Sequence, residues 1–131
     1  MSRKKAVFIR EEIGASYAES YLQRKGFEVD RRIEITEGDM RNLPSSGIDL
    51  VVLDPVGSTE YSAMAMRLVR ALRPDYGSPS PIELVIWTAH HPQDGGNIGE
   101  MLTEMKLRGA QVKDSRLPVI FYQTIDKLCE K

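Results

Sequence analysis

The sequence predicts one α/β domain, residues 1–131, built on a parallel β-sheet with helices on both faces. Residues 48–54 are almost wholly apolar and are bounded by Gly47 and Pro55, a pattern typical of a strand buried on both faces. Similar runs alternate with helix-like segments along the chain, and this alternation favours right-handed crossovers between parallel strands. The length suffices for a single hydrophobic core.

The first part of the chain predicts two strands and a helix ahead of the central strand. Residues 5–9 form an apolar run, and residues 15–25 carry apolar side chains at helical spacing before a glycine. Residues 27–35 predict the second strand, and its arginines indicate a sheet edge. Residues 36–47 are rich in turn formers, with at most a short helix around 39–43.

The rest of the chain continues the alternation. Ser58 or Thr59 suits the N-cap of a long helix that ends before Pro74, and Asn97 suits the cap of a second helix that ends at Gly109. The predicted elements are a helix over 58–73, a strand over 82–89, a helix over 97–109, a strand over 117–122 and a helix over 124–130. Five such strands suggest the order 2-1-3-4-5 of the flavodoxin-like (CheY-like) three-layer sandwich.

Composition narrows the range of functions. The net charge of −1 gives no overall attraction for nucleic acid or a membrane surface. The basic N-terminus precedes an apolar stretch too short for a signal peptide or a membrane span. Cys129 is the single cysteine, which suits a reducing compartment. We therefore expect a cytoplasmic protein.

Polar residues follow the strands predicted to lie at the centre of the sheet. Glu11 and Glu12 come just after the first strand, Asp54 ends the third, and Thr88 lies near the end of the fourth. Ligands of open α/β sheets bind at these carboxyl ends. The carboxylates are suited to hold Mg²⁺, and an ionised aspartate beside the ion can accept a phosphoryl group. An acid at the end of a buried strand also has a simpler explanation, because it stays hydrated there.

Several segments resemble the receiver domain of response regulators. They are residues 21–29, 49–54, 68–73 and 84–89, and the turn Gly109-Ala110. The resemblance implies that Asp54 is the phosphoacceptor and Thr88 the switch hydroxyl. It also implies that Glu11 and Glu12 correspond to the acidic pair that holds Mg²⁺.

The sequence departs from the receiver pattern in ways that predict an atypical receiver, or pseudo-receiver. The acidic pair consists of glutamates, whose greater length displaces a metal that needs tight octahedral geometry. The lysine expected at the end of the last strand is replaced by Tyr122-Gln123-Thr124. We expect a signalling or protein-interaction module whose partner is a histidine kinase or a downstream effector. Its phosphorylation site at Asp54 is expected to be degenerate rather than active. A homodimer remains open.

An enzyme is the alternative hypothesis. Residues 57–62 follow the central strand and weakly resemble the nucleophile loop of nucleoside deoxyribosyltransferase-like enzymes. In this interpretation Glu60 attacks the sugar and Asp39 donates a proton. A glutamate at a helix start also complements the helix dipole without any catalytic role.

Overall fold

The computed structural model describes residues 4–11, 16–77 and 80–130. Five parallel strands form one sheet in the order β2-β1-β3-β4-β5, which confirms the predicted fold. The strands are β1 (Lys4–Ile9), β2 (Phe27–Arg32), β3 (Leu50–Leu53), β4 (Glu83–Thr88) and β5 (Gln111–Asp114). The predicted edge position of β2 is also confirmed.

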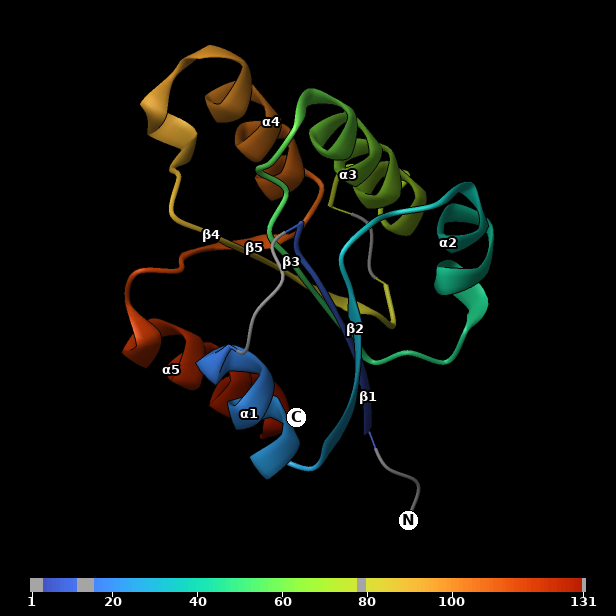
Figure 1. The fold of residues 1–131 in the computed structure, drawn as a ribbon, viewed down its shortest axis with the longest axis vertical. Helices are drawn as coiled ribbons and strands as arrows, with labels where there is room; N and C mark the ends of the chain where they lie inside the picture. Colours follow the sequence, from blue (N-terminus) through green and yellow to red (C-terminus); the bar gives the residue numbers. More distant parts are fainter. Residues whose placement is uncertain (1–3, 12–15, 78–79, 131) are drawn as a thin grey trace.

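Helices cover both faces of the sheet (Figure 1). They are α1 (Tyr17–Arg24), α2 (Glu37–Asn42), α3 (Thr59–Leu72), α4 (Gly96–Leu107) and α5 (Pro118–Cys129), with the 3-10 turns η1 (Leu43–Ser45) and η2 (Pro92–Asp94). The α1 and α5 helices pack on one face around Phe8 and Phe121. The α2, α3 and α4 helices cover the other face around Leu53 and Leu68. No described helix is long and apolar enough to cross a membrane.

The central strand is β3, as predicted, and all four of its side chains are buried. Apolar side chains on both faces of such a strand enter both cores, so the strand resists a shift in register. The α3 helix follows it with Ser58 as N-cap, and the Ser58 hydroxyl accepts from the Tyr61 N–H at 3.2 Å. The buried strand and the capped helix therefore fix both ends of the intervening loop.

The predicted fifth strand is wrong. Residues 117–122 lie at the start of α5, and the strand is β5, formed by Gln111–Asp114. Val119 is 55 % exposed, whereas Phe121 and Ile125 are buried four residues apart, as on the inner face of a helix. Pro118 occupies the first turn, where its missing N–H is tolerated. The short apolar run had no clear period, and the real strand is a short, half-buried edge of mostly polar residues.

The start of α4 also differs from the prediction. Gly95 is its N-cap with a φ of 77°, and Asn97 lies inside the helix. A positive φ is accessible to glycine because it has no Cβ, so the chain can turn sharply out of η2 into α4. Gly99 then faces η2 so closely that an added Cβ would lie 2.9 Å from the Pro92 carbonyl oxygen.

Candidate functional site at the carboxyl edge of the sheet

Asp54 lies where three adjacent strands end. The β1 and β3 strands pair Ile9 with Leu53, and β3 and β4 pair Leu53 with Ile86. Asp54 immediately follows, and its N–H donates to the Ile9 carbonyl at 2.9 Å. The parallel register therefore gathers the ends of β1, β3 and β4 on one edge of the sheet, as the sequence predicted.

The Asp54 carboxyl group is half-buried and has polar contacts on two sides. It accepts a hydrogen bond from the Val56 N–H at 3.1 Å. Burial raises its pKa above the ordinary value for aspartate, and hydrogen bonds from the Val56 N–H and the Thr88 hydroxyl oppose that rise. Thr88 is fully buried at the end of β4. The structure thus brings Asp54 and Thr88 together.

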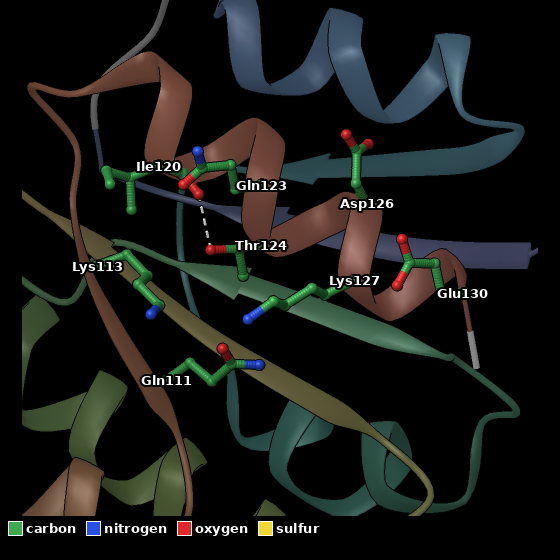
Figure 2. Close-up of a pocket in the computed structure, with 8 residues that line it drawn as sticks. All are labelled: Gln111, Lys113, Ile120, Gln123, Thr124, Asp126, Lys127 and Glu130. Atoms are coloured by element: carbon green, nitrogen blue, oxygen red, sulfur yellow. Dashed lines mark hydrogen bonds between the residues drawn. The ribbon is translucent and has the colours of Figure 1, made fainter.

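Two cationic groups act on Asp54, and neither is a lysine. Arg10 follows β1 directly and His90 lies two residues after the end of β4, and their charges lower the pKa of Asp54 against the effect of burial. The last strand is β5, and the lysine in it is Lys113. Its side chain lines a groove between β5 and α5, together with Lys127 (Figure 2). Arginine, together with histidine when its ring is protonated, therefore supplies positive charge near Asp54.

Glu11 is held by the start of α3. Its Oε1 accepts from the Ser58 N–H and its Oε2 from the Ser58 hydroxyl, each at 2.8 Å. Gly57 permits this approach, because a Cβ there would lie 2.5 Å from Glu11 Oε1. The sequence predicted Glu11 as a metal ligand but gave no sign of this contact between residues 47 apart.

The predicted Mg²⁺ site is only partly described. Glu12 lies outside the described residues. Among the residues that are described, no group of three or more His, Cys, Asp or Glu side chains is arranged to hold a metal ion. Both Glu11 oxygens accept a hydrogen bond from Ser58, which holds the carboxylate at the start of α3 and leaves one lone pair free on each oxygen. The donor set of Glu11, Glu12 and Asp54 therefore stays a prediction.

The first turns of α3 also hold the loop that follows Asp54. The Tyr61 hydroxyl donates to the Asp54 main-chain carbonyl at 2.5 Å, and the Ser62 hydroxyl donates to the Pro55 carbonyl at 2.8 Å. Tyr61 is buried, with 6 % of its surface exposed. Sequence reasoning placed Tyr61 on the core face of the helix but missed its hydroxyl, because no short-range pattern links residues 61 and 54.

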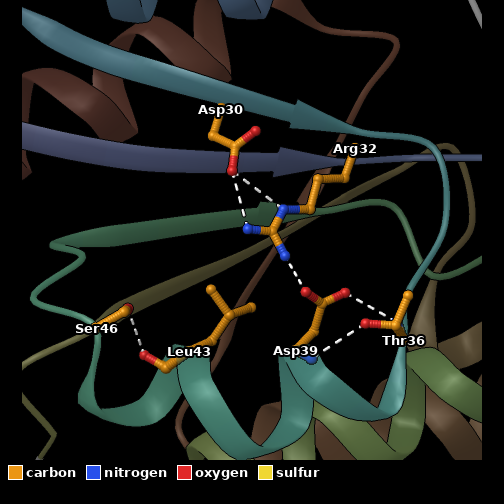
Figure 3. A network of polar contacts seen from close by, with 6 residues as sticks. All are labelled: Asp30, Arg32, Thr36, Asp39, Leu43 and Ser46. Atoms are coloured by element: carbon orange, nitrogen blue, oxygen red, sulfur yellow. Dashed lines mark hydrogen bonds and ion pairs between the residues drawn. The ribbon is translucent and has the colours of Figure 1, made fainter.

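The residues of the alternative enzyme hypothesis have structural roles or exposed positions. The Asp39 carboxylate is paired with Arg32 and accepts from the Thr36 N–H at 2.8 Å in a capping box at the start of α2 (Figure 3). Glu60 is exposed in the first turn of α3. It lines a shallow groove of about 210 Å³ with Glu11 and Tyr61. This arrangement offers no support for a paired nucleophile and proton donor.

The groove between β5 and α5 is larger, at about 520 Å³, and is also distinct from the Asp54 site. Figure 2 shows Lys113, Lys127 and Gln111 directed into it, while Asp126 points away. Asp126 accepts from the Tyr21 hydroxyl and pairs with Lys25 on the α1 side. The largest of these grooves therefore does not coincide with the edge where Asp54 and Thr88 meet.

Comparisons with known proteins reveal similarity in structure but not in sequence. No protein-family model matches the chain, and no curated protein matches it. The fold is similar to a CheY-like response regulator receiver domain protein from Methanospirillum hungatei JF-1, with a TM-score of 0.66 and 15% identity, covering 98% of this chain and 95% of that one.

Two further solved structures give the same result. A signal receiver domain from Vibrio parahaemolyticus has a TM-score of 0.64 at 14% identity, with 98% of this chain and 90% of that chain covered. A two-component response regulator of the LuxR family from Aurantimonas sp. SI85-9A1 has a TM-score of 0.61 at 18% identity, with 98% and 86% covered. The chain therefore has the CheY-like fold seen in these receiver domains.

Proposed function

We propose that this chain is a signalling module of receiver type that recognises a protein partner. The observation that carries the proposal is the Asp54 carboxyl group beside the Thr88 hydroxyl, at the ends of two adjacent central strands. Ligand sites of open α/β sheets form at this edge. A phosphoryl group on Asp54 would lie within reach of Thr88. Phosphorylation would therefore change the contacts of the end of β4 and of the loop that follows it.

The chemical step would be attack by an Asp54 carboxylate oxygen on the phosphorus of a phosphodonor. A new P–O bond forms to Asp54, and the bond between phosphorus and the leaving atom of the donor breaks, with its electron pair going to that atom. A magnesium ion, when bound by Asp54 with Glu11 and Glu12, would neutralise charge on the transferred group. Thr88 would then donate a hydrogen bond to a phosphoryl oxygen.

We further propose that this centre is degenerate. Glu11 is engaged by Ser58, and Arg10 contributes positive charge near Asp54. We expect both features to weaken the affinity for Mg²⁺, the first by holding Glu11 at the start of α3 and the second by repelling a cation. We therefore expect phosphorylation to be slow, and the module to act through its surface on a histidine kinase or a downstream effector in the cytoplasm.

Beryllofluoride, which mimics a phosphoryl group on aspartate, provides the test. The uniformly ¹⁵N-labelled protein is titrated with beryllofluoride at rising Mg²⁺ concentrations, and amide shifts are followed. We expect shifts in the loops after β3 and β4 only at high Mg²⁺, and none in Asp54→Asn. Thr88→Ala should still bind but lose the shifts that follow β4.

The outcomes separate the parts of the proposal. A response that persists in Asp54→Asn would overturn the assignment of the acceptor. A tight response at low Mg²⁺ would overturn degeneracy and leave an active receiver. If the wild-type protein gives no response at any Mg²⁺ concentration, phosphoryl transfer is rejected, and only the interaction module remains.

A further inference from the structure

We propose that Tyr61 is a positioning residue for Asp54, which fixes the carboxyl group against Thr88. The inference rests on the proposed function, and it adds a role that comes from α3 rather than from a strand end. The Tyr61 hydroxyl donates to the Asp54 main-chain carbonyl at 2.5 Å. This bond ties the candidate phosphoacceptor to the first turn of the helix that follows it.

Asp54 is restrained at both of its backbone polar groups. Its N–H donates to Ile9 of β1, and its carbonyl accepts from Tyr61 of α3. Asp54 follows the last residue of β3, where the hydrogen bonds between strands end, and Tyr61 supplies the hydrogen bond to its carbonyl. The backbone sets the direction of the Cα–Cβ bond, so losing the Tyr61 bond would let the backbone that carries the carboxyl group shift relative to Thr88.

Tyr61 is itself rigidly placed. Its N–H donates to the Ser58 hydroxyl, and its ring lies so close to Gly57 that an added Cβ there would be 3.0 Å from Cδ2. Burial, followed by the negative charges of Asp54 and Glu11, raises the pKa of Tyr61. The hydroxyl therefore stays protonated at physiological pH and remains a donor. A second clamp lies beside it, because Ser62 donates to the Pro55 carbonyl.

The decisive variant is Tyr61→Phe, which removes the hydroxyl and keeps the ring. A matched control exists in Tyr17→Phe, because the Tyr17 hydroxyl also donates to a main-chain carbonyl, that of Ser115, at 3.0 Å. Tyr17 belongs to α1, on the opposite face of the sheet. Tyr17→Phe therefore shows what the loss of a hydroxyl–carbonyl bond away from Asp54 does to the Asp54 readouts.

Two readouts are measured on wild type and both variants. The first is the titration of the Asp54 carboxyl carbon by ¹³C NMR without metal, with Asp54→Asn used to assign the signal. In Tyr61→Phe we expect the pKa of Asp54 to fall toward that of an exposed carboxyl group, because the group leaves the buried position that raises its pKa. The second is beryllofluoride affinity at saturating Mg²⁺, which we expect to fall about tenfold. Tyr17→Phe should leave both unchanged.

Failure of the proposed function and failure of the positioning role of Tyr61 give different results. If wild type does not bind beryllofluoride, the proposed phosphoryl chemistry fails, while the Asp54 titration still tests positioning. If Tyr61→Phe keeps the wild-type titration, positioning is overturned, whatever the result with beryllofluoride. Should Tyr61→Phe fail to fold, hydrogen exchange of the Tyr61 hydroxyl proton in the wild-type protein replaces it. A Tyr61 hydroxyl that exchanges as fast as that of the exposed Tyr76 would show that the bond to Asp54 is not held, and would equally overturn the inference.

Discussion

Glu11 and Ser58 form a two-point contact, in which the serine N–H and hydroxyl each donate to one carboxylate oxygen at 2.8 Å. The contact joins the segment after β1 to the N-terminus of α3, where a negative charge is favourable. Both partners are exposed, so water competes with the contact and it contributes on the order of 1 kcal/mol. A magnesium ion bound by Glu11 would have to accommodate the position that Ser58 gives the carboxylate.

Substitutions at Ser58 can separate capping from the Glu11 contact. Ser58→Asn keeps a capping side chain that can also donate to Glu11, so we expect stability close to wild type. Ser58→Asp also caps but places a second carboxylate against Glu11, and we expect a loss of about 1 kcal/mol from like-charge repulsion. Urea unfolding at neutral pH and low salt measures both. Equal stability of the two variants would contradict the Glu11 contact.

Gly57 is predicted to be required by that contact. An added Cβ would lie 2.5 Å from Glu11 Oε1, so Gly57→Ala should displace the carboxylate and lower the free energy of unfolding by about 1 kcal/mol. In a Glu11→Ala background the same substitution should have a clearly smaller effect. The coupling energy from this double-mutant cycle should exceed about 0.5 kcal/mol. Additive effects would show that Gly57 is needed for another reason.

The features that were predicted correctly from the sequence are those that depend on a local pattern of residues. The buried β3 run, its terminal Asp54 and the Ser58 cap are each encoded within a few residues, and each was found as expected. The β5 strand was missed because Gln111–Asp114 is mostly polar and is too short to show a clear alternation of apolar and polar residues. The strand was therefore predicted at the apolar residues 119–121, which lie in α5.

The interactions that shape the candidate site were beyond the reach of sequence patterns. The Glu11–Ser58 contact joins residues 47 apart. Tyr61 was predicted for the core, and its ring is buried there, but only the folded loop brings its hydroxyl to Asp54. Apolar periodicity fixes which face of a helix is buried, whereas it carries no information on which carbonyl a buried hydroxyl reaches.

Asp54 should destabilise the folded protein at neutral pH. Burial raises its pKa, so the folded state holds the proton more tightly than the unfolded state and is penalised once the group ionises. Asp54→Asn is therefore expected to be more stable than wild type at pH 7. The advantage should shrink as pH falls through the raised folded pKa, and vanish below the unfolded value near 3.8.

Urea unfolding of both proteins between pH 7 and pH 3 measures that difference. Asp75→Asn is the matched control, because Asp75 is exposed in the loop after α3. We expect its stability to track wild type at each pH. An Asp54→Asn variant that is less stable than wild type at pH 7 would show that the ionised carboxylate is stabilised by its surroundings.

Glu104 should show the opposite pH dependence. Hydrogen bonds from Arg70, and then from Arg108, lower the pKa of Glu104 to about 2. Arg70 binds both carboxylate oxygens, at 2.8 and 2.9 Å, and joins α3 to α4. Because the folded pKa is depressed, the stabilisation is fully present above the unfolded value of 4.5 and is lost as pH falls toward 2.

Glu104→Gln should therefore lower the free energy of unfolding by roughly 1 kcal/mol at pH 7, since a bidentate network lies at the upper end for surface ion pairs. The deficit should close between pH 4.5 and 2, and it should shrink with added salt because the Arg70–Glu104 pair is exposed. Glu100→Gln, on an exposed position of the same helix, is the control and should change little. A deficit of constant size from pH 7 to 2 would mean that Glu104 stabilises the helix pair by packing of its side chain, and not by its charge.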